Sequence, residues 1–515
     1  MSEETQMTAG NPAGASSATR CNSWESIPWF KAKAQVSRLQ MRIAKAEREG
    51  RPGKVKALQR LLTTSFYGRC MAIKRVTSSK GKNTPGVDGV VIRTPNQKIK
   101  AANDLKRMGY KPSPLRRIYI PKKSGKMRPL SIPTFKDRSM QALWHAALVP
   151  IAEERADKNA YGFRPKRSTQ DAIEQCFVAL SRKRSATLVL EGDIKACFDR
   201  ISHDWLLNNI PMDKTILRKF LKAEFMENGE RYPTDLGVPQ GGTISATLAL
   251  MALSGIEAKL VSTNNRIRNK EKINIIAYAD DFVVTAATEQ LLKEKVMPTL
   301  TTALKEVGLE LSNEKTKITS IEKGFEFLGF NIRKYSCGKL LIKPSKANIK
   351  TFLGEIKSII RTSGSLPTET LIHRLNQKIT GWTNYYRSVV SSKVFAKIDS
   401  EIFLELNRWV LKRHPTKGKR WISVKYYTTV NGNHWRFYCI IKDKEGKKRN
   451  LYLKLASDTH IRRHTKIKAE ANPFDPRFKE YFKQRASKGK AKGKNTANST
   501  GLNNTQPYAG LSAVP

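Results

Sequence analysis

The sequence predicts an α+β protein of several domains. Near the start of the chain, at 36–62, apolar residues recur at helical spacing. In the middle, two short apolar runs at 185–194 and 273–284 have the length and composition of buried strands. The pattern returns to helices at 343–420 and then to alternating strands at 421–455. Helical and strand segments are therefore both well represented, and each is justified in turn below.

The charge of the chain indicates its class of partner. The 515 residues include 95 Lys and Arg and 44 Asp and Glu, which leaves a formal net charge of +51. This excess rules out most ordinary metabolic enzymes, because a compact chain so charged repels itself unless a polyanion binds. A ribosomal protein would fit the charge but not the length. The hydrophobic content of 39% is enough for substantial cores, so we expect a folded protein that binds nucleic acid.

The cysteines and the apolar runs indicate the cellular compartment. The six cysteines are far apart and form no CxxC pair, which argues against a disulfide framework and against a zinc module. The polar start, 1–23, lacks the apolar core of a signal peptide, and we expect it to be disordered. The longest weakly apolar run, 243–256, is too short to span a bilayer. The sequence thus predicts a soluble protein in a reducing compartment, with no membrane partner.

The segments that precede the central strands predict a helical extension and a basic hairpin. Residues 24–75 have helical periodicity on both sides of a Gly-Arg-Pro-Gly break at 50–53. At 116–133, residues that favour strands alternate around a Ser-Gly turn. This pattern predicts a hairpin with cations at its tip, which could grip phosphates.

Carboxylates stand at the ends of both central strands. Asp193 closes the first run, and Asp280 with Asp281 forms a turn in the second. An isolated Asp-Asp pair is usually only a turn, but two acidic strand ends in so basic a chain are better explained by Mg²⁺, which prefers carboxylate oxygens. Two such ions can activate a 3′-hydroxyl and stabilise a pyrophosphate leaving group. The sequence therefore predicts nucleotidyl transfer.

Eight ordered blocks resemble those of the reverse transcriptase/maturase proteins encoded by group II introns. The blocks are TPGVDG (84–89), RPLSIP (128–133), YGFRPKRSTQDAI (161–173), GDIKACFDRISHDWLL (192–207), GVPQGGTIS (237–245), YADD (278–281), GLELSNEKTKI (308–318) and FEFLGF (325–330). The combination of GFRP and PQGG separates this family from viral RNA-dependent polymerases. The resemblance implies a right-hand polymerase, with fingers and palm at 76–342, an α-helical thumb/maturase (X) domain at 343–420 and a basic nucleic-acid-binding region at 421–485.

The resemblance also implies roles for single residues. Asp193, Asp280 and Asp281 would be catalytic and would hold two Mg²⁺ ions, with the backbone of Ile194 taking part. Phe198 would pack under the incoming sugar and leave no space for a 2′-hydroxyl. Lys315 would assist the departing pyrophosphate, although an ordinary surface lysine is an equally good interpretation. The other nucleotide contacts would be Lys122 and Arg128, on the triphosphate, and Gln240, beside two glycines that permit close backbone approach.

Several residues of these blocks have both a structural and a functional interpretation. We expect four phenylalanines, Phe163, Phe325, Phe327 and Phe330, to lie in the core. Arg164 either contacts template or forms a salt bridge. The aromatic stripe of Trp382, Tyr385 and Tyr386 is more typical of a core than of base stacking. RNA contacts are expected from Arg387, Lys412, Arg413, Lys417, Lys419 and Arg420.

The C-terminal segment resembles the part of the family that leads into an HNH endonuclease domain. We expect that domain to be missing here. His460 and His464 are spaced as on one helix face, but with no Cys nearby we expect them to be solvated or to face phosphates. Residues 486–515 are polar and rich in Gly and Asn, and predict a disordered tail.

The resemblance implies an RNA-directed DNA polymerase that binds its parent group II intron RNA, assists splicing and supports intron mobility. The implied partners are that RNA, an RNA template with a DNA primer, dNTPs and target DNA, in a nucleoid-associated ribonucleoprotein of the bacterial cytoplasm. Two alternatives stay open: a maturase whose polymerase is only a scaffold, and a host-domesticated reverse transcriptase that serves another pathway such as defence. The intact carboxylates argue against the first.

Overall fold

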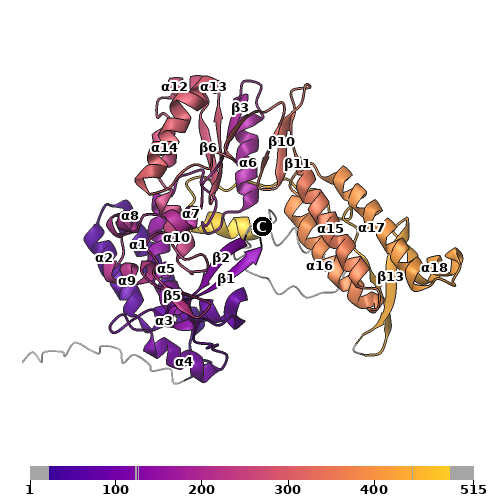
Figure 1. The fold of residues 1–515 in the computed structure, drawn as a ribbon, viewed down its shortest axis with the longest axis horizontal. Coiled ribbons are helices and arrows are strands. Elements are labelled where there is room, and N and C mark those ends of the chain that lie inside the picture. The colour runs from indigo at the N-terminus through magenta and orange to yellow at the C-terminus, as the bar shows by residue number, and fades with distance from the viewer. Residues whose placement is uncertain (1–22, 122–124, 126, 444, 488–515) are drawn as a thin grey trace, which may run out of the picture. The chain divides into compact units, whose positions relative to one another are not determined.

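The protein folds into two compact units, each described here by itself. The computed structural model describes residues 23–121, 125, 127–443 and 445–487, whose ribbon is drawn in Figure 1. Nearly all of the two predicted tails, and also Lys122, lie outside the described residues. The first unit comprises residues 1–151, 211–235 and 239–244, and the second comprises 152–210, 236–238 and 245–515.

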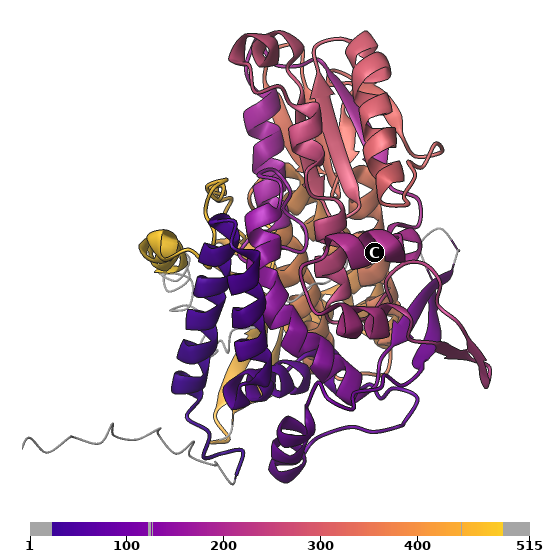
Figure 2. The same cartoon turned by 90° about the vertical axis from the view of Figure 1, so that its left-hand side faces the viewer.

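The first unit combines a helical extension with a small mixed sheet. Val36, Leu39 and Ile43 are buried along one face of the first helix, as the periodicity predicts, and the first two helices lie side by side (Figure 2). The helices are α1 (Trp29–Arg48), α2 (Pro52–Thr64), α3 (Phe66–Thr77), α4 (Pro95–Asp104), most of α5 (Phe135–Arg155) and α9 (Lys214–Leu221), with a 3₁₀ turn η1 (Lys80–Asn83). The strands are β1 (Leu115–Pro121), β2 (Met127–Ile132), β4 (Phe225–Glu227) and β5 (Glu230–Tyr232), in the order β2-β1-β4-β5.

The basic hairpin is confirmed by the pairing of β1 with β2. The two strands are antiparallel, and Ile120 lies opposite Arg128. The segment 239–244 lies along this hairpin, since Ser131 N donates to Gln240 O at 2.8 Å. Gly241 has φ +121°, and a Cβ there would lie 2.8 Å from Ser131 O, so the close backbone approach expected at this glycine is present.

The second unit is built on an antiparallel sheet of order β6-β7-β3-β8. Val189, Ile276 and Val283 are buried in the same cluster as residues of helix α6, whereas Ile275 and Phe282 point to the side of α14. Strands buried on both faces explain the continuous apolar runs in the sequence. The strands are β3 (Leu188–Asp193), β6 (Asn274–Tyr278), β7 (Asp281–Ala286) and β8 (Lys317–Ser320). The helices are α6 (Thr169–Leu180), α7 (Cys197–Arg200), α8 (His203–Asn209), α10 (Ser245–Ala252), α11 (Ile256–Leu260), α12 (Asn265–Glu271), α13 (Glu289–Leu291), a π-helical turn η2 (Leu292–Val296) and α14 (Met297–Glu306).

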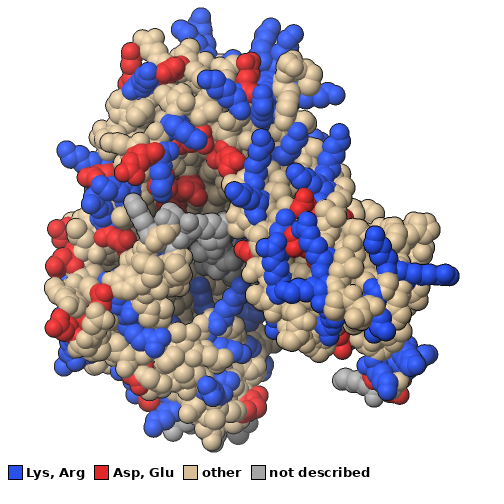
Figure 3. All heavy atoms as spheres, turned by 45° about the vertical axis from the view of Figure 1, so that its right-hand side comes forward, with Lys and Arg blue, Asp and Glu red and all other residues tan. Residues whose placement is uncertain are grey.

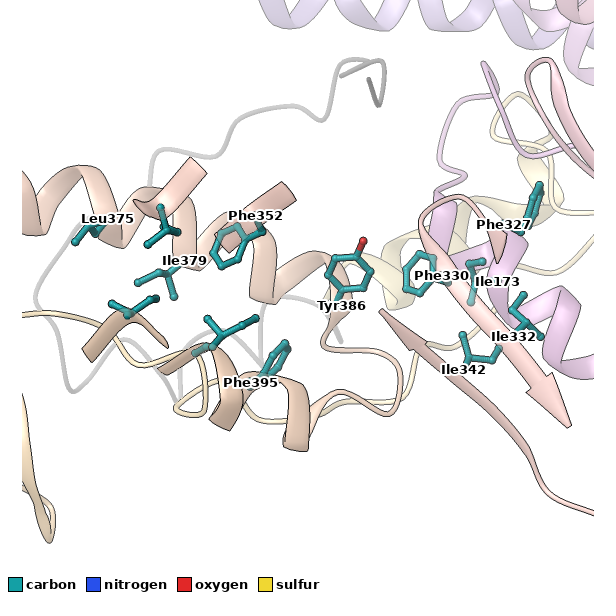
Figure 4. Packing of buried hydrophobic residues seen from close by; sticks show 14 of the residues in the cluster. Ile173, Phe327, Phe330, Ile332, Ile342, Phe352, Leu375, Ile379, Tyr386 and Phe395 are labelled. Atoms are coloured by element: carbon teal, nitrogen blue, oxygen red, sulfur yellow. The ribbon is translucent and has the colours of Figure 1, made fainter. Parts of the chain in front are cut away.

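A second sheet and a set of long helices continue the core of this unit. The sheet contains β9 (Phe325–Phe327), β10 (Phe330–Lys334) and β11 (Leu340–Pro344), and the helices are α15 (Lys346–Thr362), α16 (Thr368–Tyr386), α17 (Ser392–Arg413) and α18 (Lys419–Tyr426). Figure 4 shows Phe330 next to Tyr386, with Phe352 and Ile379 further along the helices. Trp382 stacks on Phe352 at 4.7 Å between ring centroids, and the Tyr386 hydroxyl donates to Gly329 O at 3.0 Å. The predicted aromatic stripe is therefore core.

The C-terminal strands are confirmed in part. Strands β12 (Tyr427–Val430), β13 (Asn433–Lys442) and β14 (Lys448–Tyr452) form an antiparallel sheet that includes the expected Asn-Gly turn. The prediction that strand structure begins at residue 421 is wrong, because 421–426 belong to α18. Ile422 and Tyr426, four residues apart, are both buried on one face of that helix. After β14 the chain is irregular apart from η3 (Pro476–Phe478) and a helix at 479–487.

Two further findings concern the charge of the surface and the possibility of membrane-spanning helices. Lys and Arg project from many parts of the face shown in Figure 3, as expected from the net charge of +51. Within the part of the chain that the structure describes, no single helix has the length and apolar character needed to cross a membrane. Two neighbouring helical segments, Ser245–Leu260 and Asn265–Glu271, are together long and apolar enough to span a membrane, but the angle between them is 98°.

Candidate active site

The three predicted carboxylates meet at one end of the sheet in the second unit. Strands β3 and β7 pair antiparallel, and this register places Asp193 opposite Asp281. Tyr278 pairs with Asp281 where β6 turns into β7, so Asp280 lies in the turn between them. We call residues 278–281 the YADD turn. Separate strands thus bring the three carboxylates to the same end of the sheet.

The charges at this end of the sheet influence one another. Partial desolvation, with the negative charges of Asp280 and Asp193, raises the pKa of Asp281 to about 6. The ammonium of Lys315 opposes this rise and lies 2.9 Å from Asp193 Oδ2. Its hydrogen bond to Asp193 raises the pKa of Lys315, and Asp281 and Asp280 add to the shift. Lys315 is therefore part of the site rather than an unrelated surface lysine.

The backbone around residues 309–312 carries Lys315 to the carboxylates. Ser312 N donates to Asp193 O at 2.8 Å, and Lys195 N donates to Glu310 O at 2.9 Å. These bonds continue the pairing of β3 beyond its last residue.

The YADD turn rests on the segment just before α6. Ala277 N donates to Asn159 O at 3.0 Å, and Tyr161 N donates to Ala277 O at 2.8 Å. Ala279 has φ +60°, a left-handed conformation that is sparsely populated for residues other than glycine and that surrounding structure must hold. A Cβ on Gly162 would lie 2.1 Å from Ala279 N, so this position of the YGFRP block accommodates only glycine.

Phe198 lies on α7 in the second unit, a few residues after Asp193. Its ring meets that of Phe163 edge to face, with 5.7 Å between centroids. Val238 N donates to Phe198 O at 2.6 Å, and a Cβ on Gly237 would meet the same oxygen at 2.5 Å. Gly237 and Val238 therefore support the backbone that carries Phe198.

The expectation for the four phenylalanines is only partly confirmed. Phe325, Phe327 and Phe330 are fully buried. Phe163 is only half-buried, with φ +61°, and lines an apolar cavity that also borders Ile194 and Ala279. Placing Phe163 in the core was therefore wrong. Apolar neighbours in sequence could not reveal that its backbone turns sharply there.

The remaining nucleotide candidates belong to the first unit. Arg128 is half-buried on β2, and Gln240 lies beside β2 through its bond to Ser131. Their roles stay predictions.

The side chains of the site can be compared with the ligands that a metal ion requires. Within the described residues, no three His, Cys, Asp or Glu side chains converge closely enough to hold a metal by themselves. The donors at the YADD turn fit Mg²⁺ in the way usual for this ion, which takes one or two carboxylates and completes its shell with substrate phosphates and water. The mutual repulsion evident at Asp281 also favours a bound cation there.

The structure decides between the two interpretations of Arg164. Its guanidinium forms a bidentate pair with the buried Glu153, at 2.9 and 2.7 Å. Arg167 binds the same carboxylate at 2.7 Å. The salt-bridge interpretation is therefore correct. Sequence reasoning missed Glu153 and Arg167, because nothing in the pattern of an apolar helix marks which acid is buried.

The position of His464 contradicts the prediction made for this residue. Instead of facing solvent or phosphate, its Nε2 lies 2.8 Å from Oδ1 of Asp171, which is buried at the start of α6. Arg485 Nη2 reaches the same oxygen at 3.0 Å. A Ser-x-x-Asp capping box at 168–171 was a readable signal for the position of Asp171, but its distant partners were not.

The candidate RNA contacts fall into two groups. Arg387 donates to His460 O at 3.2 Å and Arg413 donates to Leu366 O at 2.7 Å, so both are engaged within the fold. The others are exposed, and they are Lys412, Lys417, Lys419 and Arg420.

Family models match three parts of the chain. Residues 120–332 match the family described as reverse transcriptase (RNA-dependent DNA polymerase), 24–105 match the N-terminal domain of reverse transcriptase, and 349–427 match the group II intron maturase-specific domain. A telomerase from Candida albicans, solved in complex with a fragment of telomeric RNA, is similar at a TM-score of 0.36 and 13% identity, over 62% of this chain and 65% of that one.

Two curated relatives show how far the similarity extends. Protein YkfC of Escherichia coli is 32% identical over 344 residues, which are 58% of this chain and 89% of that protein. The group II intron-encoded protein LtrA of Lactococcus lactis is 30% identical over 359 residues, or 56% of this chain and 59% of LtrA. The palm sheet with its paired carboxylates, the three matched domains and these relatives show one family, with the right-hand polymerase fold. The chain belongs to the group II intron reverse transcriptase/maturase family.

Proposed function

We propose that the protein is an RNA-directed DNA polymerase whose active site is formed by Asp193, Asp280 and Asp281. The observation that carries this proposal is the pairing of Asp193 with Asp281 across β3 and β7, beside Asp280 in the turn. Mg²⁺ held by these carboxylates, with Ile194 O as a further oxygen, would activate the primer 3′-hydroxyl and neutralise the triphosphate. The substrates are dNTPs, with an RNA template and a DNA primer.

The other residues of the site would position the nucleotide. Phe198 would lie against the sugar, where its ring excludes a 2′-hydroxyl. Lys315, which remains protonated because of its bond to Asp193, would donate a proton to the departing pyrophosphate. Arg128, Gln240 and Lys122 would hold the triphosphate and the nucleotide.

A second activity is proposed on the helices that follow the palm. Residues 349–427 match the maturase-specific domain, and the exposed Lys412, Lys417, Lys419 and Arg420 offer charge for phosphates. We propose that this part binds the parent intron RNA and assists its splicing. Intron mobility would follow when the ribonucleoprotein meets target DNA on the bacterial nucleoid.

The test removes the carboxylates of the YADD turn. Asp280→Ala with Asp281→Ala should abolish primer extension on an RNA template, while intron RNA binding and splicing persist. The matched control is Glu289→Ala with Glu294→Ala, which changes the charge equally at exposed positions of α13 and η2. Extension by the YADD variant at the rate of the control would refute the site. Splicing assistance without any extension by the unaltered chain would identify a maturase with a vestigial polymerase.

A further inference from the structure

A buried ion cluster lies behind the YADD turn. The side chains of Glu153, Arg164 and Arg167 are 0%, 3% and 1% exposed. Both oxygens of Glu153 are used, because Arg164 bonds to each of them and Arg167 shares Oε1. Burying charged groups costs free energy, and their mutual attraction offsets this cost only when each group is paired with good geometry. Such a cluster therefore contributes more to fixing one arrangement of its side chains than to the stability of the fold.

One side of the cluster faces the YADD turn. Arg164 Nη1 donates to Asp157 O at 2.6 Å and to Ala160 O at 2.8 Å. Ala160 lies between Asn159 and Tyr161, the two residues that bond to the N–H and the C=O of Ala277. Asp157 further accepts from Gly255 N at 2.9 Å and Glu257 N at 3.1 Å at the start of α11. Arg164 therefore fixes the segment on which the YADD turn rests.

The other side of the cluster faces the C-terminal segment 456–487, which we call the strap. Arg167 Nη2 donates to Ala469 O and Ala471 O, each at 3.2 Å. The strap is held there by Asp171, which accepts from Ile467 N at 2.8 Å in addition to binding His464 and Arg485. Ile467 and Ala471 are fully buried, and Asn472 Nδ2 donates to Glu154 at 2.8 Å.

We propose that Glu153, Arg164 and Arg167 are positioning residues for nucleotide addition and that the strap completes their cluster. The inference rests on the proposed polymerase function. The contacts run without a gap from the strap through Arg167, Glu153 and Arg164 to the 157–162 segment and the YADD turn. Arg167 Nε is buried without a hydrogen-bond partner among the described residues, and loosening the strap would leave Nη2 of the same guanidinium unbonded as well, so the cluster must shift to satisfy them. The strap is then a part of the polymerase itself and not only a region that binds nucleic acid.

The first test is Arg167→Lys. Lysine keeps the positive charge beside Glu153 but has one ammonium, which cannot serve Glu153 and both strap carbonyls together. The expected result is a kcat for dNTP addition reduced about 10-fold or more, because small misplacements of reacting groups are amplified in the rate. KM for dNTP should stay within about twofold, since no nucleotide contact is changed. Amide hydrogen exchange in the peptide 273–284 should become faster.

The control is Ile360→Val, a conservative core change in α15, where the side chain is fully buried and where none of the hydrogen bonds described for the strap is made. It lowers stability without touching the strap contacts, so it should leave kcat and exchange in 273–284 unchanged. An equal loss of kcat in the control, or unchanged kcat and exchange in Arg167→Lys, would overturn the inference.

A second variant guards against misfolding at Arg167. Asp171→Asn keeps the shape of the side chain but removes the charge that holds His464 and Arg485, and should produce the same changes at smaller amplitude. If the unaltered chain extends no primer, the proposed function fails, but the exchange measurement still decides the inference. Faster exchange in 273–284 supports the coupling, and unchanged exchange in both variants refutes it.

Discussion

Gly162 is the residue on which the geometry of the YADD turn depends most directly. An added Cβ would lie 2.1 Å from Ala279 N and 2.8 Å from Tyr278 C, both backbone atoms that cannot rotate away. We therefore expect Gly162→Ala to lower primer extension by about 100-fold or more, because the turn must move by a distance on the order of 1 Å. Gly354→Ala is the matched control, since nothing lies within 4 Å of a Cβ there and alanine favours the helix. Comparable single-turnover rates for the two variants would contradict this prediction.

Phe198 tests the proposed sugar contact. Its ring packs on Phe163, and its backbone oxygen accepts a hydrogen bond from Val238 N, so a smaller side chain opens space while the backbone of α7 stays in place. Phe198→Val should reduce discrimination against ribonucleotides by about 10- to 200-fold, the range that one steric contact supplies. Competition between dNTP and NTP in primer extension measures this ratio. An unchanged ratio would show that another residue excludes the 2′-hydroxyl.

Single residues differ in how far sequence could predict them. Asp193, Asp280 and Asp281 were identifiable because strand-end carboxylates in a basic chain call for a cation. His464 was not, because its partner Asp171 is 293 residues away and periodicity carries no information at that range. The prediction for Phe163 was wrong for a local reason, because a positive φ in a residue other than glycine has no reliable sequence signal.

At the scale of elements, the start of helix α6 depends on Asp171, the third helical residue, which forms a capping box with Ser168. Burial alone would raise the pKa of Asp171, but hydrogen bonds from His464, Ile467 and Ser168 outweigh this and hold the pKa below its ordinary value of 3.8. A carboxyl with a depressed pKa in the folded state stabilises the fold above its unfolded pKa, and this contribution disappears as pH falls through the folded pKa.

The resulting prediction compares the unaltered chain with Asp171→Asn. At about pH 5 the variant should have a free energy of unfolding lower by roughly 1.5–3 kcal/mol, the worth of hydrogen bonds to a charged group. The difference should shrink as pH falls below about 4, because the carboxyl of the unfolded chain takes up a proton first and the native carboxylate, whose pKa is lower, follows. Urea denaturation across this pH range measures both quantities. A difference that stays constant down to pH 3 would show that the charge of Asp171 contributes nothing.

Among the elements, the periodic ones were predictable and the irregular ones were not. The hairpin β1–β2, the central strands and helices such as α16 follow from alternation or helical spacing of apolar residues. The start of the last sheet was misplaced because the aromatic residues of 421–426 suit a strand as well as a helix. The strap has almost no regular structure, and its position results from contacts with α6, α16 and α17 that are distant in sequence.

At the scale of the whole molecule, the net charge of +51 predicts that RNA binding depends steeply on salt. Each phosphate contact releases counterions, so the logarithm of the binding constant falls linearly with the logarithm of salt concentration, by about 0.7 per contact for a single strand and about 0.9 for a duplex. This term alone does not locate the contacts, because Lys and Arg are spread over the face seen in Figure 3.

The phosphate contacts can be located by substituting lysines of the proposed RNA-binding surface and, as a control, an equal number of lysines elsewhere. Lys412, Lys417 and Lys419 are exposed, whereas Arg413 beside them is bonded to Leu366 O and should matter less for RNA than for the fold. Changing the three lysines to Ala should reduce the salt slope for intron RNA by about 2 to 3, close to one per lost phosphate contact. The control changes Lys293, Lys305 and Lys323, which are also exposed, and so removes the same charge elsewhere. If the two triple variants lose equal slope in filter-binding titrations, the attraction comes from the total charge, and the proposed RNA-binding surface at 412–420 is wrong.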